Sequence, residues 1–374
     1  MRDRLAEEPA DLPMGAGPIW VGGMAFSPDS SGTGPWSSLP PALLTLPELA
    51  LVRTGDRHLL TISALVGPGD DPGRVRDRLA ARLSSLRETA LPPLDPHPGG
   101  PASVTSARRP ADYEAAVAAA VETIRSGRAE KLVLAREVTV TAPAAHSPDA
   151  LFGALRGSFG SCFCFCVGTP EAAFVGASPE LLVRRSGAVA ATVALAGSAR
   201  RSADPAVDDH LGEQLLHSAK NRSEHAIVAR RIAKRLAPWS VWVEEATEPV
   251  VIRVANIQHL ATPLHAQLAE PRSALELAGM LHPTPAVGSE PRGARGEELI
   301  RELESFDRGW YAGPVGWMDA AEDGEFCVAL RSALLRDRTA SLFAGAGIVA
   351  DSDPAAELAE TEIKLAALLP LLAG

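Results

Sequence analysis

Lysine is scarce in this chain, and its few lysines are the first candidates for chemistry. Among 36 basic residues, only four are lysines: Lys131, Lys220, Lys234 and Lys364. Arginine keeps its proton in proteins, whereas a lysine that is buried or crowded by another cation can lose it. A general base is therefore expected among the lysines that this arginine-rich sequence retains. For Lys234, which lies on an arginine-rich helical face, chance retention is the simpler explanation.

A second group of chemically active residues lies near the C-terminus. Glu357, Glu360 and Lys364 are spaced i, i+3 and i+7, which places them along one face of a helix. A solvated Glu360–Lys364 pair is the simplest interpretation of that spacing alone. Just upstream, residues 343–349 (FAGAGIV) have the pattern of a strand with two glycines. Glycine lets the backbone approach a ligand closely, so a ligand site beside the acidic helix is the alternative.

The elements that position these groups fall into two regions of the chain. Residues 1 to about 88 contain short strand-like runs, such as 59–66, and a helical segment at 73–87. A proline-rich stretch, 91–110, has the composition of a linker or an extended crossing. Beyond it, periodicity and capping signals predict a helix at 112–126 capped by Asp112, strands at 131–141, 161–168 and 172–176, and helices at 207–236 and 353–369. This interspersion indicates a mixed α/β or α+β domain.

Bulk properties exclude several classes of function. A net charge of −10 argues against nucleic acid or an anionic membrane as the main partner. No apolar run approaches the roughly 18 residues that span a bilayer, and the N-terminal segment lacks the apolar core of a signal peptide. Cys162, Cys164 and Cys166 alternate with phenylalanines, which predicts thiols on one strand face rather than a disulfide or a metal site. We expect a reduced, cytoplasmic protein.

Ten short motifs follow one another from about residue 111 to the C-terminus. They are EKLVLARE (130–137), FVGASPELLVRR (174–185), LAGSARR (195–201), SAKNRSEH (218–225), NIQHLATPL (256–264), HPTPAVG (282–288), FDRGWYAGPVGW (306–317), VALRSALL (328–335), FAGAGIV (343–349) and AETEIK (359–364). In order and spacing they resemble the chorismate-utilising enzymes, which include the anthranilate, aminodeoxychorismate, salicylate and isochorismate synthases. Each motif is weak alone, but ten in one order do not arise by chance.

The resemblance implies a fold as well as a chemistry. The expected fold is α+β, of the anthranilate synthase component I type, with two large packed antiparallel sheets and helices outside. The active site is expected in the cleft between the sheets. The resemblance assigns residues 106–374 to the chorismate-binding catalytic region. Residues 1–105 match only loosely and are assigned to the N-terminal scaffold of the fold.

The resemblance also implies roles for individual side chains. Lys131 matches the family's general base, and Glu180 matches the general acid that protonates the leaving hydroxyl. Glu224 and Glu360 match the carboxylates that hold Mg²⁺, an ion that prefers oxygen ligands and keeps several waters. Glu357 is a further candidate that reaches the ion through water, with a plain surface role as the alternative.

Other matched positions contact the substrate. Arg331 and Lys364 match the cationic groups that bind a substrate carboxylate. His259 stands where the family has a histidine near the ring, although a packed core histidine fits equally well. Lys220 lies one helical turn before Glu224 and is expected to steer that carboxylate. The remaining predicted substrate-binding positions are Gly197, Ser198, Ala286, Gly345 and Gly347.

The implied reaction is the synthesis of isochorismate. Water attacks C2 of chorismate while the C4 hydroxyl leaves, which requires a base on one side and an acid on the other. Ala286 occupies the position of a threonine in the ammonia-using synthases, and 195–198 is LAGS where they have IAGT. Both departures favour water over ammonia, so no glutaminase subunit is expected. Salicylate synthase, which goes on to eliminate pyruvate, is the alternative. A non-catalytic chorismate-binding protein would be expected to lack Lys131 or Glu180.

Overall fold

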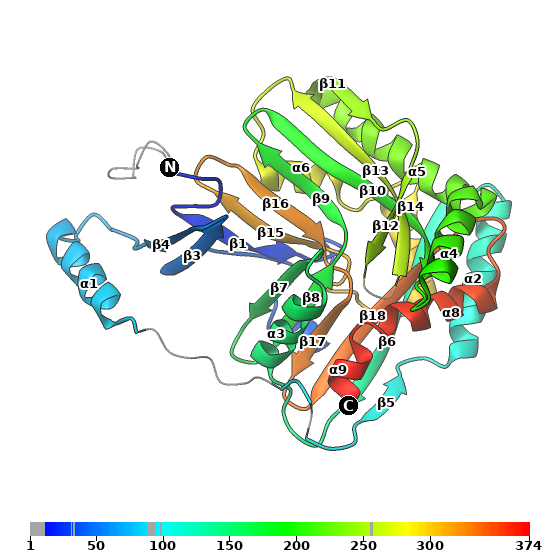
Figure 1. The fold of residues 1–374 in the computed structure, drawn as a ribbon, viewed down its shortest axis with the longest axis horizontal. Helices are drawn as coiled ribbons and strands as arrows, with labels where there is room; N and C mark the ends of the chain where they lie inside the picture. Colours follow the sequence, from blue (N-terminus) through cyan, green and yellow to red (C-terminus); the bar gives the residue numbers. More distant parts are fainter. Residues whose placement is uncertain (1–11, 31, 33, 88–94, 98, 255–256) are drawn as a thin grey trace.

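Two large antiparallel sheets form the body of the molecule in the computed structural model (Figure 1). The structure describes residues 12–374 except 31, 33, 88–94, 98 and 255–256. One sheet has the strand order β11-β13-β10-β9-β16-β15-β1-β2, with β12 paired to β13 as well. The other has the order β14-β6-β18-β17-β8-β7, with β5 paired to β6. A separate hairpin joins β3 and β4.

The nine-stranded sheet consists of β1 (Ile19–Met24), β2 (Ala42–Thr45), β9 (Leu181–Ser186), β10 (Val189–Arg200), β11 (Ser240–Glu245), β12 (Val250–Val254), β13 (Ile257–Leu268), β15 (Pro314–Asp319) and β16 (Gly324–Val328). The seven-stranded sheet consists of β5 (Ser103–Ser106), β6 (Lys131–Thr141), β7 (Phe163–Gly168), β8 (Ala173–Ser178), β14 (Ser289–Glu290), β17 (Ser332–Arg336) and β18 (Thr339–Ile348). The hairpin consists of β3 (Leu49–Thr54) and β4 (Arg57–Ile62).

Helices lie outside these sheets. They are α1 (Pro72–Ser85), α2 (Pro110–Arg125), α3 (Pro148–Ser158), α4 (Pro205–His217), α5 (Ala219–Leu236), α6 (Ala274–Leu281), α7 (Ala294–Glu304), α8 (Pro354–Leu365) and α9 (Leu369–Ala373). Helix α1 has no buried residue and projects from the body in Figure 1. Helices α2, α4, α5 and α8 gather on the opposite side, where α5 packs on β10 and α8 on β18.

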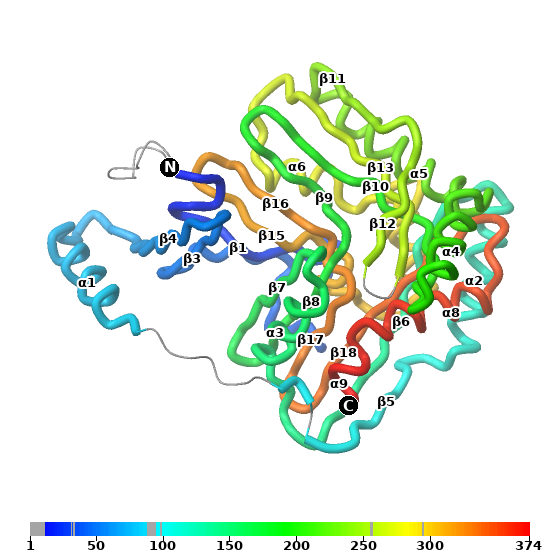
Figure 2. The backbone as a smooth tube through the Cα atoms, viewed as in Figure 1, coloured from blue at the N-terminus to red at the C-terminus, as the bar shows by residue number. Residues whose placement is uncertain are grey.

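Segments far apart in sequence share one core. Figure 2 shows the N-terminal strand β1 beside β15, and their register pairs Val21 with Trp317. Trp36, from a short 3₁₀ turn, is 2% exposed and stacks on Phe343 of β18 with ring centroids 5.8 Å apart. Burying aromatic rings supplies much of the favourable free energy of folding, so residues near the N-terminus stabilise the sheets that carry the later motifs.

Some predicted elements agree closely with the structure. Strand β6 covers 131–141 as predicted, and β8 and β7 lie within two residues of the predicted 172–176 and 161–168. Cys162, Cys164 and Cys166 are free thiols, as predicted, and Cys327 is free as well. Strand β4 ends at Ile62 rather than at residue 66, and the helix predicted at 353–369 ends at Leu365, with α9 starting at Leu369.

The predicted helix at 207–236 is wrong as a single element. Ser218 has an extended backbone (φ −68°, ψ 116°) that ends α4, and its side chain accepts a hydrogen bond from Asn221 N to begin α5. Asp112 is also not a cap, because Arg109 occupies that position and Pro110 begins α2. The proline-rich stretch was predicted to be a linker or an extended crossing, and its residues 103–106 form the strand β5 against β6. Residues 91–94 and 98 lie outside the described part.

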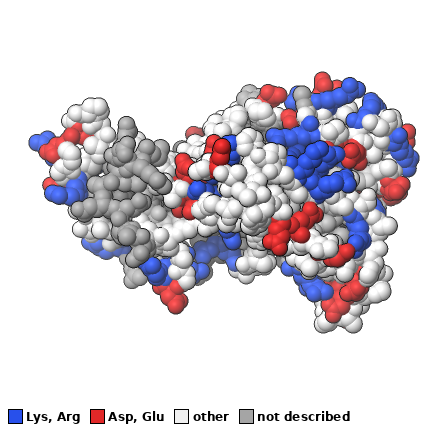
Figure 3. Space-filling model, turned by 90° about the horizontal axis from the view of Figure 1, so that it is seen from above, with Lys and Arg blue, Asp and Glu red and all other residues white. Residues whose placement is uncertain are grey.

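The surface shows no single dominant charge on the face in Figure 3. Basic and acidic side chains lie beside one another over one half of this face, and the centre is largely uncharged.

Among the described residues, no helix is both long and apolar enough to cross a bilayer.

Candidate active site

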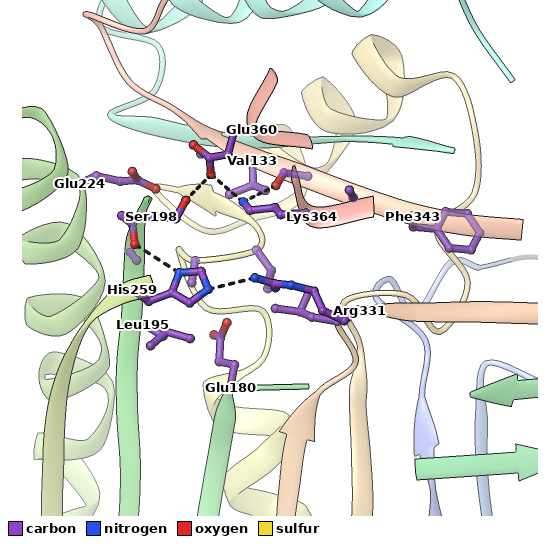
Figure 4. A pocket seen from close by; sticks show the side chains of 18 of the residues that line it. Val133, Glu180, Leu195, Ser198, Glu224, His259, Arg331, Phe343, Glu360 and Lys364 are labelled. Atoms are coloured by element: carbon purple, nitrogen blue, oxygen red, sulfur yellow. Dashed lines mark hydrogen bonds and ion pairs between the residues drawn. The ribbon is translucent and has the colours of Figure 1, made fainter. Parts of the chain in front are cut away.

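A pocket lies where the two sheets face each other, and most of the predicted site residues line it (Figure 4). Its volume is about 620 Å³ including the space open to solvent. Strands β10 and β13 of one sheet, β6 and β18 of the other, and helices α5 and α8 all contribute side chains or backbone. The predicted residues that line it are Glu180, Gly197, Ser198, Glu224, His259, Ala286, Arg331, Gly345, Gly347, Glu360 and Lys364.

Lys131 lies just behind this lining and contacts one of the predicted metal ligands. It is fully buried at the start of β6, and its Nζ lies 2.9 Å from Glu224 Oε1. This contact is a close ion pair without hydrogen-bond alignment. Gly347 makes it sterically feasible, because a Cβ there would lie 2.1 Å from Glu224 Oε1. Gly347, which was predicted to let a ligand approach the backbone, therefore also leaves room for the Lys131–Glu224 pair.

Glu180 is placed by the short connection between β8 and β9. Its side chain is buried, and its backbone N–H donates to Ser178 Oγ over 3.1 Å. Burial raises the pKa of Glu180 to about 7, although Arg331, Lys131 and Lys364 all oppose the rise. A carboxyl group with that pKa retains its proton in a substantial fraction of molecules at neutral pH, which is what a general acid needs.

His259 makes one hydrogen bond to Gly197, at a bulge in β10, and another to Arg331, a cation that lines the pocket. Gly197 has φ +75°, and the β10–β13 register shifts between Ala196 and Ser198. His259 Nδ1 lies 3.2 Å from the Gly197 carbonyl oxygen, so this nitrogen carries the hydrogen. Burial and Arg331 lower the pKa of His259 to about 3, which keeps the ring neutral. Its Nε2 is then free to accept a hydrogen bond from Arg331 at 2.9 Å.

Arg331 is held in a backbone conformation that few residues adopt. Its φ is +45°, in the left-handed region that costs a non-glycine residue roughly 1–3 kcal/mol. The side chain is 8% exposed, and Figure 4 shows it directed toward His259 in the pocket. A strained, buried guanidinium with one donor already oriented by His259 is suited to holding an anion.

Helix α8 supplies a second cation and a carboxylate to the same pocket. Lys364 Nζ lies 2.7 Å from Glu360 Oε1 and donates to the Gly345 carbonyl at 2.7 Å. Ser198 donates to Glu360 Oε1 at 2.8 Å. Burial raises the pKa of Glu360, but Lys364 and Ser198 outweigh it and lower the pKa to about 2. The pair that spacing alone suggested is thus partly buried, and both of its side chains line the pocket.

Two predicted placements differ from what the structure shows. Glu357 does not line the pocket and is 1% exposed. Lys220, which was expected to steer Glu224, instead lies with its Nζ 2.5 Å from Glu357 Oε1. The surface alternative for Glu357 is therefore wrong, and its link to a metal ion stays a prediction.

Sequence reasoning missed the aromatic wall of the pocket. Tyr311 and Phe343 line it, with ring centroids 5.2 Å apart in a stacked arrangement. Burial raises the pKa of Tyr311 to about 12, so its hydroxyl stays protonated and can donate a hydrogen bond. Both residues lie inside motifs that the sequence analysis had identified, at 306–317 and 343–349. An aromatic residue within such a motif could have predicted a place in the pocket wall.

The carboxylates of the pocket suit Mg²⁺, which also takes water and substrate oxygens, better than they suit a metal ion whose ligands all come from the protein. In the described part of the chain, no cluster of three or more His, Cys, Asp or Glu residues could hold a metal ion. Glu224 and Glu360 nevertheless line the same pocket, each beside a lysine. Mg²⁺ typically takes one or two carboxylates and completes its shell with water and substrate oxygens. These two glutamates would hold the ion if it binds.

Comparisons with known proteins agree with this geometry. The family model described as "Chorismate binding enzyme" matches residues 2–373. The "Salicylate biosynthesis isochorismate synthase" of Pseudomonas aeruginosa is 40% identical over 96% of this chain and 75% of its own length. The "Isochorismate synthase MenF" of Bacillus subtilis is 34% identical over 96% of this chain and 75% of its own length.

Solved structures show the same fold. The menaquinone-specific isochorismate synthase MenF of Escherichia coli superposes with a TM-score of 0.80 at 30% identity, over 95% of this chain and 78% of that one. Anthranilate synthase component I of Streptococcus pneumoniae has a TM-score of 0.78 at 23% identity, over 96% and 82% of the two chains. The expected α+β fold of the anthranilate synthase component I type is confirmed.

Proposed function

The chain belongs to the chorismate binding enzyme family, and we propose on this basis that it is an isochorismate synthase. The observation that carries the proposal is Glu180, a buried carboxyl with a pKa of about 7 that faces the same pocket as two cations, the buried Arg331 and the partly buried Lys364. That combination places an acid beside groups able to hold a dianionic substrate. The curated relatives that match over most of this chain bear the same activity in their names.

The proposed reaction adds one water and expels another. Lys131, in its neutral amine form, takes a proton from the attacking water as the water oxygen bonds to C2 of chorismate. The ring double bonds shift, the C4–oxygen bond breaks, and Glu180 gives its proton to the departing hydroxyl. A positioned acid and base each contribute roughly 10²- to 10⁴-fold to the rate of such steps. Atoms balance, so the product is an isomer of the substrate.

The remaining groups bind and orient the substrate. Arg331, which donates a hydrogen bond to His259, and Lys364 would pair with the substrate carboxylates, and the Tyr311 hydroxyl would add a donor; all three residues line the pocket. Mg²⁺ on Glu224 and Glu360 would neutralise these two acids and attract the ring carboxylate. Ala286 lines the pocket at the position where the ammonia-using synthases have a threonine, and this difference favours water over ammonia as the nucleophile. No glutaminase partner is needed for that chemistry.

Two other functions compete with this one. A salicylate synthase would make isochorismate and then eliminate pyruvate in the same pocket. A non-catalytic chorismate-binding protein would need neither Glu180 nor Lys131. We place the enzyme in the cytoplasm, where it would supply the synthesis of menaquinone, of a siderophore or of salicylate. Salicylate and menaquinone appear in the names of two similar proteins.

Product analysis of the purified protein with chorismate tests the proposal. Reactions are run with Mg²⁺, with EDTA, with EDTA followed by excess Mg²⁺, and with ammonium added. Isochorismate as the sole product, lost with EDTA and recovered with Mg²⁺, is the expected result. Salicylate with pyruvate would assign the lyase-coupled reaction instead, and an aminated product would contradict the role given to Ala286. Folded protein that forms no product would leave the non-catalytic function.

A further inference from the structure

Helices α5 and α8 carry the two predicted metal carboxylates, and an ion pair joins these two helices. Lys220 precedes Glu224 by four residues on α5, and Glu357 precedes Glu360 by three residues on α8. Residues three or four apart lie on one helical face. The Lys220–Glu357 contact, with 2.5 Å between Nζ and Oε1, therefore lies one turn away from the metal carboxylate on both helices.

The environment of Glu357 requires a partner. Its side chain is 1% exposed, whereas that of Lys220 is 33% exposed. Burial and the neighbouring carboxylate of Glu360 disfavour its charged form, while Lys220 and a hydrogen bond with Ser352 favour it. A buried carboxylate is costly to leave unpaired. Lys220 thus anchors a group that would otherwise be repelled by Glu360.

Glu357 is also not among the residues that line the substrate pocket. Glu224 and Glu360 both line that pocket. Glu357 Oε1 accepts a hydrogen bond from Lys220, and its side chain also has a hydrogen bond with Ser352. The contact with Lys220 therefore connects α5 to α8 outside the lining of the pocket.

We propose that Lys220 and Glu357 form a positioning pair, which fixes α5 against α8 and thereby sets the separation of Glu224 and Glu360, and that Glu357 is not itself a ligand. The proposal rests on the proposed function and its two-carboxylate metal site. It differs from a metal-shell role for Glu357 in a testable way. A positioning pair stops orienting the metal carboxylates when either partner is removed. If Glu357 were a metal ligand, removing only Lys220 would free its carboxylate and could even make it more available to the ion.

The experiment uses the full chain and four variants: Lys220→Met, Glu357→Gln, the double variant and Lys220→Arg. Binding of Mn²⁺, as a spectroscopic substitute for Mg²⁺, is measured by the loss of free-ion EPR signal. Thermal unfolding is measured separately in EDTA, and kcat and KM for chorismate are measured with excess Mg²⁺. Arg222→Met is the matched control, because Arg222 lies on the same helix and pairs with Glu248 at the surface.

A positioning pair predicts that both single variants weaken Mn²⁺ binding by roughly tenfold or more, the usual effect of removing a group that orients ligands. The double variant should be no weaker than either single variant, Lys220→Arg should recover most of the affinity, and Arg222→Met should bind normally. The single and double variants should also have similar melting temperatures in EDTA, below that of the wild type.

Other outcomes would overturn the pair. Weak Mn²⁺ binding in Glu357→Gln with normal or tighter binding in Lys220→Met would make Glu357 a metal-shell residue. Additive losses in the double variant would show that the two side chains act independently. The unfolding readout needs neither substrate nor metal. If the wild type proved to make no isochorismate, the proposed function would fail, while the melting temperatures would still decide whether the two side chains are coupled.

Discussion

Two carboxylates in the pocket have pKa values that move in opposite directions. Burial dominates at Glu180 and raises its pKa to about 7, whereas Lys364 and Ser198 overcome burial at Glu360 and lower its pKa to about 2. Environments that separate the pKa values of two acids in this way commonly separate their roles. Glu180 is suited to donate a proton at neutral pH, and Glu360 is suited to remain charged and attract a cation.

Glu180→Gln removes the proposed acid while keeping the size of the side chain. We expect kcat to fall roughly 10²- to 10⁴-fold. In the wild type, the active form of Glu180 is the protonated one, so kcat/KM should fall as the pH rises above about 7. Isochorismate formation, followed across the pH range 5–9, checks both points. Chorismate binding by the variant serves as the control for folding. A variant with near-normal turnover would remove Glu180 from the mechanism.

Gly347→Ala tests whether the contact between Lys131 and Glu224 is needed. The new methyl group would lie 2.1 Å from Glu224 Oε1 and 2.9 Å from Lys131 Cε, so these side chains must move. Displacement by about 1 Å near reacting groups can cost roughly a hundredfold in rate. Steady-state kinetics should show such a loss. Gly153→Ala, on α3 with nothing within 4 Å of the added Cβ, is the control and should keep full activity.

The types of residue in the site were largely predictable from sequence, but their pairings were not. Motif matches identified Glu180, Arg331 and Glu360 because each stands within a short, recognisable segment. The contact between Lys220 and Glu357 joins residues 137 positions apart and depends on how two helices pack. No local pattern reports that packing, so the spacing of Lys220 to Glu224 suggested the wrong partner.

At the scale of elements, Ser218 shows how one side chain separates two helices. It caps α5, the helix that carries Glu224, by accepting hydrogen bonds from the backbone and side chain of Asn221. Ser218→Ala should lower the free energy of unfolding by about 1 kcal/mol, the usual value for a lost N-cap. Urea denaturation measures this change.

A matched cap elsewhere provides the control for that variant. Asp71 caps α1, a helix with no buried residue, through a bond to Gly73 N. Because α1 contributes little to the core, Asp71→Ala should leave the global unfolding midpoint unchanged. Equal losses in the two variants would mean that α1 unfolds together with the body.

Elements that depend on local pattern were predictable, and those that depend on distant partners were not. Strand β6 is rich in β-branched residues, and buried and less buried positions alternate over its second half; its limits were predicted without error. The break at Ser218 was missed because helical periodicity continues through it. Strand β5 was missed because it lies in a proline-rich stretch and forms by pairing Ser103 with Thr141, a partner that local sequence does not reveal.

At the scale of the whole molecule, the N-terminal region is part of the core rather than an appendage. Strand β1 lies between β15 and β2 in the nine-stranded sheet. Trp310 donates from Nε1 to the Pro40 carbonyl at 2.8 Å, and His282 Nε2 lies 2.9 Å from the Phe26 carbonyl oxygen. The residues that line the pocket all come from positions after 106. Some of the residues that support them come from positions before 106. The assignment of 1–105 as scaffold and 106–374 as catalytic stays a prediction about function.

This shared core predicts that the fragment 106–374 cannot fold alone, although it holds every proposed catalytic group. Removing residues 1–105 takes two strands from one edge of a sheet and the buried side chains of Trp36 and Leu39 from the core. The newly exposed apolar surface should leave the fragment aggregated or without a cooperative thermal transition. By contrast, Ala80→Pro, which breaks only α1, should keep the melting temperature and activity of the full chain. A fragment that melts cooperatively and binds chorismate would show that the catalytic region is an independent domain and that the N-terminal strands only extend it.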